Sequence, residues 1–347
     1  MDPEAREPEF DFLRVDDFLQ GVVETRALAT AFELGLIDLL LGWENPTREI
    51  VGHKLKLDRR GSDFLLGVLI SNGVVEEQGD ELRLTERFHA ALRYRDLMEA
   101  KIEFAGLVAP DFLGLFTSAI RDPGRFMRES RLFELFNYQR CLDPSPENIE
   151  LTRRWVRLTT ILTRYEAQAC LRYHRFDLSK KMLDIGGNSG EFALQVCKIH
   201  PQIQTTVFDL PVVCAIGQEH IQREPEADRI TFIRGNAIRD PFPLNFDLIT
   251  FKSMLHDWPE AEVDRFLVKA VASLEPGGTL LIFERGPVTP GSEPMPYSML
   301  PMILFFRSFR SPLGYEARLR ALGLLNIQIR EILLEMPFFL VTATKPG

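Results

Sequence analysis

Cysteine is scarce in this chain and is not arranged for cross-linking. Cys141, Cys170, Cys197 and Cys214 are widely spaced and form no C-x-x-C pair. The sequence therefore signals neither a disulfide framework nor a zinc site. We expect four buried, free thiols, as is usual in a reducing cytosol.

Long apolar runs are missing as well. The nearest candidate, residues 299–306, is far shorter than the roughly 20 apolar residues that a membrane helix needs, and Pro301 interrupts it. The polar residues 1–7 contain no apolar core of a signal peptide. We expect a cytoplasmic protein with no membrane partner.

Positive charge is also in deficit. The chain has 41 lysines and arginines against 50 aspartates and glutamates, which gives a net charge of −9. Nucleic-acid binding requires a basic face, so we expect no nucleic-acid partner. The 347 residues, 45% of them hydrophobic, suffice for a sizeable core in two domains or one large one.

What the sequence does contain is a glycine-rich turn between a strand pattern and a helix pattern. An apolar run ends at Asp184, Gly186, Gly187 and Gly190 follow, and residues 191–200 have helical spacing. This order is typical of the first unit of an α/β nucleotide-binding sheet. Glycine lets the backbone turn sharply there and lets a ligand approach the helix N-terminus.

A second acidic residue supports ligand binding at this turn. Asp209 ends the next apolar run, one strand–helix–strand step after Asp184, and an acid at that position suits the hydroxyls of a ribose. The alternative is a plain strand-to-helix turn that binds nothing. Asn188 stands where the dinucleotide fingerprint G-x-G-x-x-G needs glycine, which argues against nicotinamide-dependent reduction.

The rest of the C-terminal half continues the same α/β pattern. After Asp209 we expect helices at 211–223 and 260–274, strands at 230–233, 246–251 and 279–283, a helix starting at Ser311-Pro312, and a closing hairpin of 325–332 with 337–344. These elements predict an α/β fold with a C-terminal doubly wound, Rossmann-like sheet.

The N-terminal half reads as mainly helical. After a frayed start at 1–12, we expect helices within 15–41, interrupted at Gly35, then at 48–55 and 59–71, the last capped by Asp58. A hairpin of 74–76 with 81–84 follows, which is the pattern of a winged helix. DNA recognition is the alternative function, but helix 59–71 is mostly apolar after its two arginines and suits packing better.

The middle of the chain is rich in phenylalanine. Residues 97–141 predict helical segments broken at Pro110 and at 122–124, and a long helix at 147–174 bridges to the C-terminal half. The aromatic side chains could line an apolar ligand pocket or could be ordinary core residues: Phe104, Phe112, Phe116, Phe126, Phe133 and Phe136. We therefore divide the chain into 1–100, 101–175 and 176–347.

A candidate for acid–base chemistry follows the fourth strand. In open α/β sheets ligands bind outside the carboxyl ends of the strands, which places His256 near the ligand, beside Lys252. Glu284 ends the neighbouring strand. A histidine backed by carboxylates is a general-base arrangement. The alternative is a capping or core histidine, but Asp257, Trp258 and Glu284 around it favour catalysis.

In their order and spacing these motifs resemble those of the S-adenosylmethionine-dependent small-molecule O-methyltransferases, which include plant caffeate-like and bacterial natural-product enzymes. The resemblance covers nearly the whole chain. Residues 27–36 are similar to the family's dimerisation motif, 184–190 to D-V-G-G-G-x-G, 209–211 to D-L-P, 256–258 to H-D-W and 276–278 to P-G-G.

The resemblance implies an enzyme that methylates a hydroxyl of a small aromatic natural product, and a homodimer joined by its winged-helix domain. It implies His256 as the base, with Asp257 and Glu284 as catalytic residues, and no metal. S-adenosylmethionine would be held by Asp184, Gly186, Gly187, Asp209, Leu210, Asn236, Ala237 and Lys252. Because a phenol has a pKa of about 10, an imidazole base is chemically suitable.

Two departures keep other chemistry open. Gly235-Asn236 stands where the family has Gly-Asp, and Phe309-Arg310-Ser311 stands where it has Glu-Arg-Thr. The second departure replaces a carboxylate by an aromatic ring near the base. The alternatives are therefore transfer to carbon or nitrogen, or a cofactor-binding relative that catalyses hydroxylation, decarboxylation or a pericyclic reaction.

Overall fold

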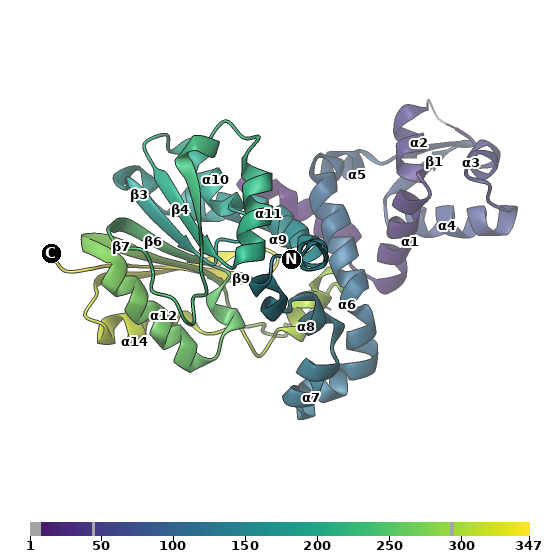
Figure 1. Ribbon diagram of the computed structural model, residues 1–347. Coiled ribbons are helices and arrows are strands. Elements are labelled where there is room, and N and C mark those ends of the chain that lie inside the picture. The colour runs from purple at the N-terminus through teal and green to yellow at the C-terminus, as the bar shows by residue number, and fades with distance from the viewer. Residues whose placement is uncertain (1–7, 44–45, 292–294) are drawn as a thin grey trace. The chain divides into compact units, whose positions relative to one another are not determined.

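The computed structural model of the chain (Figure 1) describes residues 8–43, 46–291 and 295–347. The chain forms two compact units, Met1–Phe116 with Pro290–Pro301, and Thr117–Thr289 with Met302–Gly347. The long helix α6 (Arg95–Arg121) carries the chain from the first unit into the second. The division at residues 100 and 175 that we drew from the sequence stays a prediction.

The first unit is helical apart from one hairpin. Gly35 breaks the first long helical region with a left-handed φ of 74°, and the Asp58 carboxylate caps α4 by accepting the Gly61 N–H at 2.8 Å, both as predicted. The elements are η2 (Pro8–Phe18), α1 (Val22–Glu33), α2 (Leu36–Gly42), α3 (Arg48–Leu55), α4 (Arg59–Ser71), β1 (Val75–Gln78), β2 (Glu81–Leu84), α5 (Glu86–Ala91), η3 (Leu92–Tyr94) and η8 (Tyr297–Met299).

The hairpin of β1 and β2 is antiparallel and follows the α3–α4 pair directly, which matches the winged-helix order expected from the sequence. The expectation of a frayed start was wrong for residues 8–12, which belong to η2. Phe10 and Phe12 are buried there, and burial of two aromatic rings offsets the entropy of ordering the segment. Residues 1–7 lie outside the described part of the chain.

Helix α6 differs from the sequence prediction in two respects. It runs through Pro110 without a break, because its buried residues Phe104, Ala105 and Val108 continue to Ala119 on the far side of the proline and packing outweighs one lost hydrogen bond. The segment Glu86–Arg121 is also long and apolar enough to cross a membrane by length and composition, contrary to our expectation.

That property is weak evidence for a membrane span, because core helices share it. Lys101 in the middle of α6 forms a buried ion pair with Asp16 at 2.6 Å. Leu97 and Met98 are almost completely covered by protein. These contacts bury the N-terminal part of α6, whereas only 28% of the apolar window is buried among the described residues.

The second unit is built on a seven-stranded sheet with the order β5-β4-β3-β6-β7-β9-β8. The strands from β5 to β7 are parallel, and β9 and β8 complete the sheet as an antiparallel hairpin. Their bounds are β3 (Lys181–Ile185), β4 (Gln204–Asp209), β5 (Ile230–Arg234), β6 (Phe246–Lys252), β7 (Leu274–Arg285), β8 (Leu325–Leu333) and β9 (Pro337–Thr344).

Helices cover both faces of this sheet (Figure 1), which confirms the predicted α/β class. Buried residues of α12 and α14 join those of the strands in one large core cluster, whereas α9 packs against α10 and α11. The helices are α7 (Pro123–Glu129), α8 (Arg131–Leu135), η4 (Tyr138–Leu142), α9 (Pro146–Tyr173), η5 (Phe176–Leu178), α10 (Glu191–Ile199), α11 (Pro211–Ile221), η6 (Ala227–Arg229), η7 (Leu255–Asp257), α12 (Glu260–Ser273), α13 (Leu300–Leu304) and α14 (Pro312–Ala321).

The sheet order explains why distant residues meet. β3 has β4 and β5 on one side and β6 and β7 on the other, so the strand order reverses at β3. Ligands bind at such a switch point in open α/β sheets. The carboxyl ends of β3, β4, β6 and β7 carry Asp184, Asp209, Lys252 and Glu284. The four cysteines are free and buried, as predicted.

Candidate active site

Asp184 ends β3 with one carboxylate oxygen satisfied and the other not. Oδ1 accepts a hydrogen bond from the Thr250 hydroxyl at 2.7 Å, whereas Oδ2 is buried without a hydrogen-bond partner. Burial raises the pKa of Asp184 to about 7, although the bond from Thr250 opposes the shift. A buried carboxyl group with an empty acceptor is suited to a cationic or hydrogen-bond-donating ligand.

The glycine turn after Asp184 leaves no room for side chains. Gly186 has a φ of 66°, and a Cβ there would lie 2.4 Å from Cγ of Met254. A Cβ on Gly187 would lie 2.5 Å from Oδ2 of Asp184. Asn188 adopts a left-handed φ of 56°, which asparagine tolerates better than most residues. The departure from glycine at this position therefore keeps the turn.

Asp209 ends β4 and receives hydrogen bonds on both oxygens. Oδ2 accepts the Asn188 N–H at 2.8 Å, and Oδ1 accepts the Leu210 N–H at 2.7 Å. Burial raises the pKa of Asp209 to about 6 against the effect of these two bonds. The carboxylate ties the glycine turn to the start of α11 and keeps lone pairs that could accept from a ligand diol.

Asn236 and Ala237 lie in the loop after β5. The Asn236 side-chain oxygen accepts the Ile238 N–H at 2.9 Å, and the Ala237 carbonyl accepts from the Lys269 ammonium at 2.7 Å. The loop is therefore held by its own Asn236–Ile238 hydrogen bond and by Lys269 of α12. Both side chains are half-buried at the carboxyl end of the sheet.

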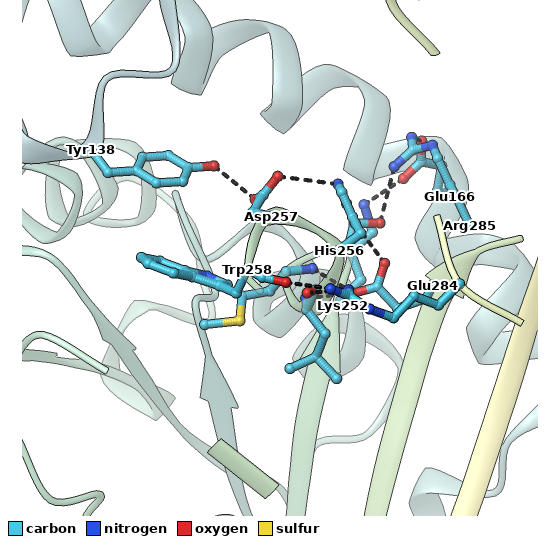
Figure 2. Close-up of polar contacts among 12 residues, drawn as sticks. Tyr138, Glu166, Lys252, His256, Asp257, Trp258, Glu284 and Arg285 are labelled. Atoms are coloured by element: carbon cyan, nitrogen blue, oxygen red, sulfur yellow. Dashed lines mark hydrogen bonds and ion pairs between the residues drawn. The ribbon is translucent and has the colours of Figure 1, made fainter. Parts of the chain in front are cut away.

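Lys252 is engaged with α9. Its ammonium donates to the Thr163 hydroxyl at 2.9 Å and forms an ion pair with Glu166, which also pairs with Arg285 (Figure 2). Burial lowers the pKa of Lys252, and the Glu166 carboxylate opposes that shift. The structure thus assigns this ammonium a partner that sequence reasoning did not identify.

His256 is held by a buried carboxylate on the next strand (Figure 2). Its Nδ1 lies 2.6 Å from Oε2 of Glu284. The other oxygen, Oε1, accepts the N–H groups of Met254 at 2.8 Å and Leu255 at 2.7 Å. Glu284 is only 1% exposed. One carboxylate therefore orients both the imidazole and the loop that carries it.

The second ring nitrogen of His256 faces the next residue in the chain. Nε2 lies 3.4 Å from Oδ1 of Asp257. Burial alone would lower the pKa of His256, but the carboxylates of Glu284 and Asp257 outweigh it and the pKa is raised. Burial raises the pKa of Glu284 in turn, and the His256 ring and the two N–H donors reverse that shift, so its pKa is lowered.

Tyr138 is a member of this site that the sequence did not indicate. Its hydroxyl donates to Oδ2 of Asp257 at 2.8 Å, and its ring stacks on Trp258 with centroids 6.0 Å apart (Figure 2). Tyr138 is 119 positions before Asp257 in the chain. No local pattern marks it, because the contact is created by η4 folding back onto the sheet edge.

Aromatic rings complete the surroundings of the imidazole. The Phe309 ring lies 5.3 Å and the Phe305 ring 6.5 Å from the His256 ring, between centroids. Phe133 and Phe136 contact Phe305 at 5.8 and 5.9 Å. Phe133 and Phe136 of the phenylalanine-rich segment thus contact Phe305, which in turn lies beside the His256 ring.

The residues at the β3–β4 edge fit the cofactor that the sequence resemblance implies. The orphaned oxygen of Asp184 suits the cationic methionine part of S-adenosylmethionine, and the remaining lone pairs of Asp209 suit its ribose. A Cβ would collide with Met254 at position 186 and with the Asp184 carboxylate at position 187, so glycine is required for the turn that presents this carboxylate.

Comparisons with known proteins agree with this geometry. Residues 146–317 match the O-methyltransferase domain family. The 3-hydroxy-5-methyl-1-naphthoate 3-O-methyltransferase of Streptomyces sahachiroi is 27% identical over 277 residues, which cover 77% of this chain and 75% of that protein. The L-tyrosine C(3)-methyltransferase of Streptomyces lavendulae is 25% identical over 295 residues, covering 82% and 79%.

A solved structure supports the same fold over nearly the full length. The crystal structure of human N-acetylserotonin methyltransferase in complex with SAM superimposes with a TM-score of 0.72 at 21% identity, covering 93% of this chain and 94% of that one. The sheet-edge acids, the glycine turn and the family match lead to one conclusion: this chain belongs to the S-adenosylmethionine-dependent O-methyltransferase family.

Proposed function

We propose that this methyltransferase transfers the methyl group of S-adenosylmethionine to a hydroxyl of a small aromatic natural product, with His256 as the general base. The observation that carries the proposal is the 2.6 Å contact between Nδ1 of His256 and the buried carboxylate of Glu284. It lies at the same sheet edge as the acids Asp184 and Asp209.

The cofactor, when bound, supplies an electrophilic methyl group on a sulfonium. We assign its methionine part to Asp184, Gly186 and Gly187. Its ribose and adenine would lie against residues at the ends of β4, β5 and β6: Asp209, Leu210, Asn236, Ala237 and Lys252. Because Lys252 is ion-paired with Glu166, it would act there through its stem or through exchange of partners.

The chain's own residues perform the proton transfer. Glu284 has a lowered pKa and stays ionised, so it accepts a hydrogen bond from Nδ1–H of His256 and leaves the lone pair on Nε2. Nε2 takes the proton of the acceptor hydroxyl. Asp257, held by Tyr138, stabilises the imidazolium that forms.

Two observations favour alternatives. One relative is described as a C(3)-methyltransferase, which supports carbon as a possible acceptor in this fold. The Phe309 ring contacts the imidazole where a carboxylate would support a stronger base, which supports non-methylating chemistry. Both alternatives keep the cofactor site and change only what happens at His256.

Product analysis separates these functions. Purified protein is incubated with methyl-labelled S-adenosylmethionine and a panel of phenols, catechols and aromatic amines. Label on a phenolic oxygen supports the proposal, and label on carbon or nitrogen supports the first alternative. Conversion of an acceptor without label transfer supports the second.

We also propose that the protein is a cytoplasmic homodimer. The motif at residues 27–36 supports the dimer, and two apolar side chains earlier on the same helix α1, Val22 and Val23, are 63% and 56% exposed. The four free thiols suit a reducing compartment. Sedimentation equilibrium of the full chain tests the dimer, and a monomer mass would contradict it.

A further inference from the structure

We propose that Arg310 is a positioning residue for the proposed base: it clamps the loop from Leu255 to Trp258 and thereby sets the place of His256. This inference rests on the proposed role of His256. Arg310 does not touch the imidazole in any described contact, so its effect would pass through the loop backbone.

The guanidinium of Arg310 donates hydrogen bonds to two carbonyl groups of the loop. Nη1 donates to the Leu255 carbonyl at 2.8 Å, and Nη2 donates to the Trp258 carbonyl. These carbonyls stand on either side of His256 in the chain. A guanidinium presents several donors in one rigid plane, so two such bonds fix the spacing of the carbonyls as well as their direction.

The regular structure of the loop is the three-residue 3-10 turn η7, in which the Asp257 and Trp258 N–H groups donate to the Met254 and Leu255 carbonyls at 3.2 and 3.3 Å. Glu284 satisfies the N–H groups of Met254 and Leu255 from the sheet side. Arg310 satisfies carbonyl groups of the same loop. Beyond the hydrogen bonds within the turn, the backbone around His256 is therefore held at two donors by Glu284 and at two acceptors by Arg310.

Arg310 is itself anchored. Its Nε donates to the Glu260 carboxylate at 2.6 Å, and Glu260 also pairs with Arg318. Only 15% of the Arg310 side chain is exposed. The preceding residue, Phe309, places its ring against the imidazole. The same short segment thus contacts the His256 ring and holds the His256 loop.

Arg318 offers a matched control, because it shares Glu260 with Arg310 but makes no described bond to the loop. It pairs with Asp264 at 2.7 Å and donates to the Gly314 carbonyl at 3.0 Å. Arg310→Ala, Arg310→Lys and Arg318→Ala are compared with the full-length protein. We expect Arg310→Ala to lower kcat on the order of 10- to 100-fold with little change in the KM for S-adenosylmethionine, because a small displacement of the base is costly.

Arg310→Lys should lose less than Arg310→Ala but should not reach wild-type kcat, since an ammonium cannot reproduce the planar fork. If Arg310→Ala does not fold, Arg310→Lys carries the test. Arg318→Ala should keep wild-type kcat. A wild-type kcat for both Arg310 variants, or an equal loss in Arg310→Ala and Arg318→Ala, would overturn the inference.

A second readout needs neither cofactor nor acceptor. The imidazoles of the six histidines are titrated by NMR, and the His256 signal is assigned by its loss in His256→Gln. The charged groups facing His256 are Glu284 and Asp257, with Arg285 opposing them. Wild-type His256 should titrate above its ordinary pKa. In Arg310→Ala the loop relaxes and this pKa should fall toward 6.5, whereas Arg318→Ala should leave it in place.

The two proposals fail differently. If His256→Gln retains full methyl transfer, the base assignment is wrong. If His256→Gln is inactive while Arg310→Ala keeps both the wild-type kcat and the wild-type His256 titration, the base assignment stands and the clamp is wrong.

Discussion

At the scale of single residues, Glu284 links the structure of the site to its chemistry. One buried carboxylate accepts two backbone N–H groups and the imidazole Nδ1. It therefore places the His256 loop, favours the tautomer with its proton on Nδ1, and raises the pKa of the proposed base.

Glu284→Gln removes the charge and one acceptor oxygen while keeping the side-chain volume. The imidazolium loses its counter-charge, and either Nδ1–H or the two backbone N–H groups lose their acceptor. We expect kcat to fall by about 100-fold, since a positioned base contributes 10²–10⁴. Because the pKa of His256 is raised, wild-type activity should fall as pH drops through a value above 6.5, and the variant's acidic limb should move to lower pH. The profile of kcat/KM against pH measures this, and an unmoved limb would contradict it.

Asp184 shows the opposite balance, in which a group that we propose for cofactor binding costs stability. Its folded pKa of about 7 exceeds the ordinary aspartate value of 3.8, so the ionised form is disfavoured by folding. The free-energy cost of keeping Asp184 buried is absent below about pH 4, where the carboxyl is protonated in both the folded and the unfolded chain. It grows between the unfolded and folded pKa values and is complete above about pH 7.

Asp184→Asn should therefore raise the melting temperature of the cofactor-free protein at pH 8. The relieved penalty is at most about 4 kcal/mol at 1.36 kcal/mol per unit. At pH 4 the variant and wild type should melt alike. Affinity for S-adenosylmethionine, measured by calorimetry at pH 8, should fall in the same variant. If Asp184→Asn melted at a lower temperature than wild type at pH 8, the claim that the buried carboxylate of Asp184 destabilises the folded protein would be wrong.

At the scale of elements, caps and glycines were readable from the sequence because they act locally. The start of α4 follows from Asp58, its end from Gly73, and the start of α14 from Ser311. The continuation of α6 through Pro110 was not readable, because it depends on packing along both sides of the proline.

Pro110→Ala tests that explanation. Pro110 is exposed inside α6, so the substitution restores a helical N–H without changing the core. We expect a stability gain of roughly 1–3 kcal/mol in urea unfolding. Pro146→Ala is the control: Pro146 is exposed at the first position of α9, where the N–H has no helical partner, and no gain is expected. Equal effects at both sites would refute the account of α6.

At the scale of the whole molecule, the sheet order assembles the site. β3 pairs in parallel with β4 and β6, and β6 with β7, so four strand ends that are far apart in sequence share one edge. This much could be predicted, since strand ends carrying acids and a nearby histidine follow a known α/β rule.

The lateral contacts within the site could not be predicted in the same way. Tyr138 on Asp257, Glu166 on Lys252 and Arg310 on the His256 loop come from helices and loops whose packing no local pattern encodes. Sequence reasoning thus found the residues on the strand ends and missed those that hold them.

The most direct test of the account compares wild type with His256→Ala in single-turnover methyl transfer to the best phenolic acceptor, with S-adenosylmethionine affinity measured in parallel by calorimetry. We predict at least a roughly 100-fold slower transfer in the variant at unchanged cofactor affinity. Equal transfer rates in the two proteins would contradict the claim that the imidazole of His256 removes the acceptor's proton.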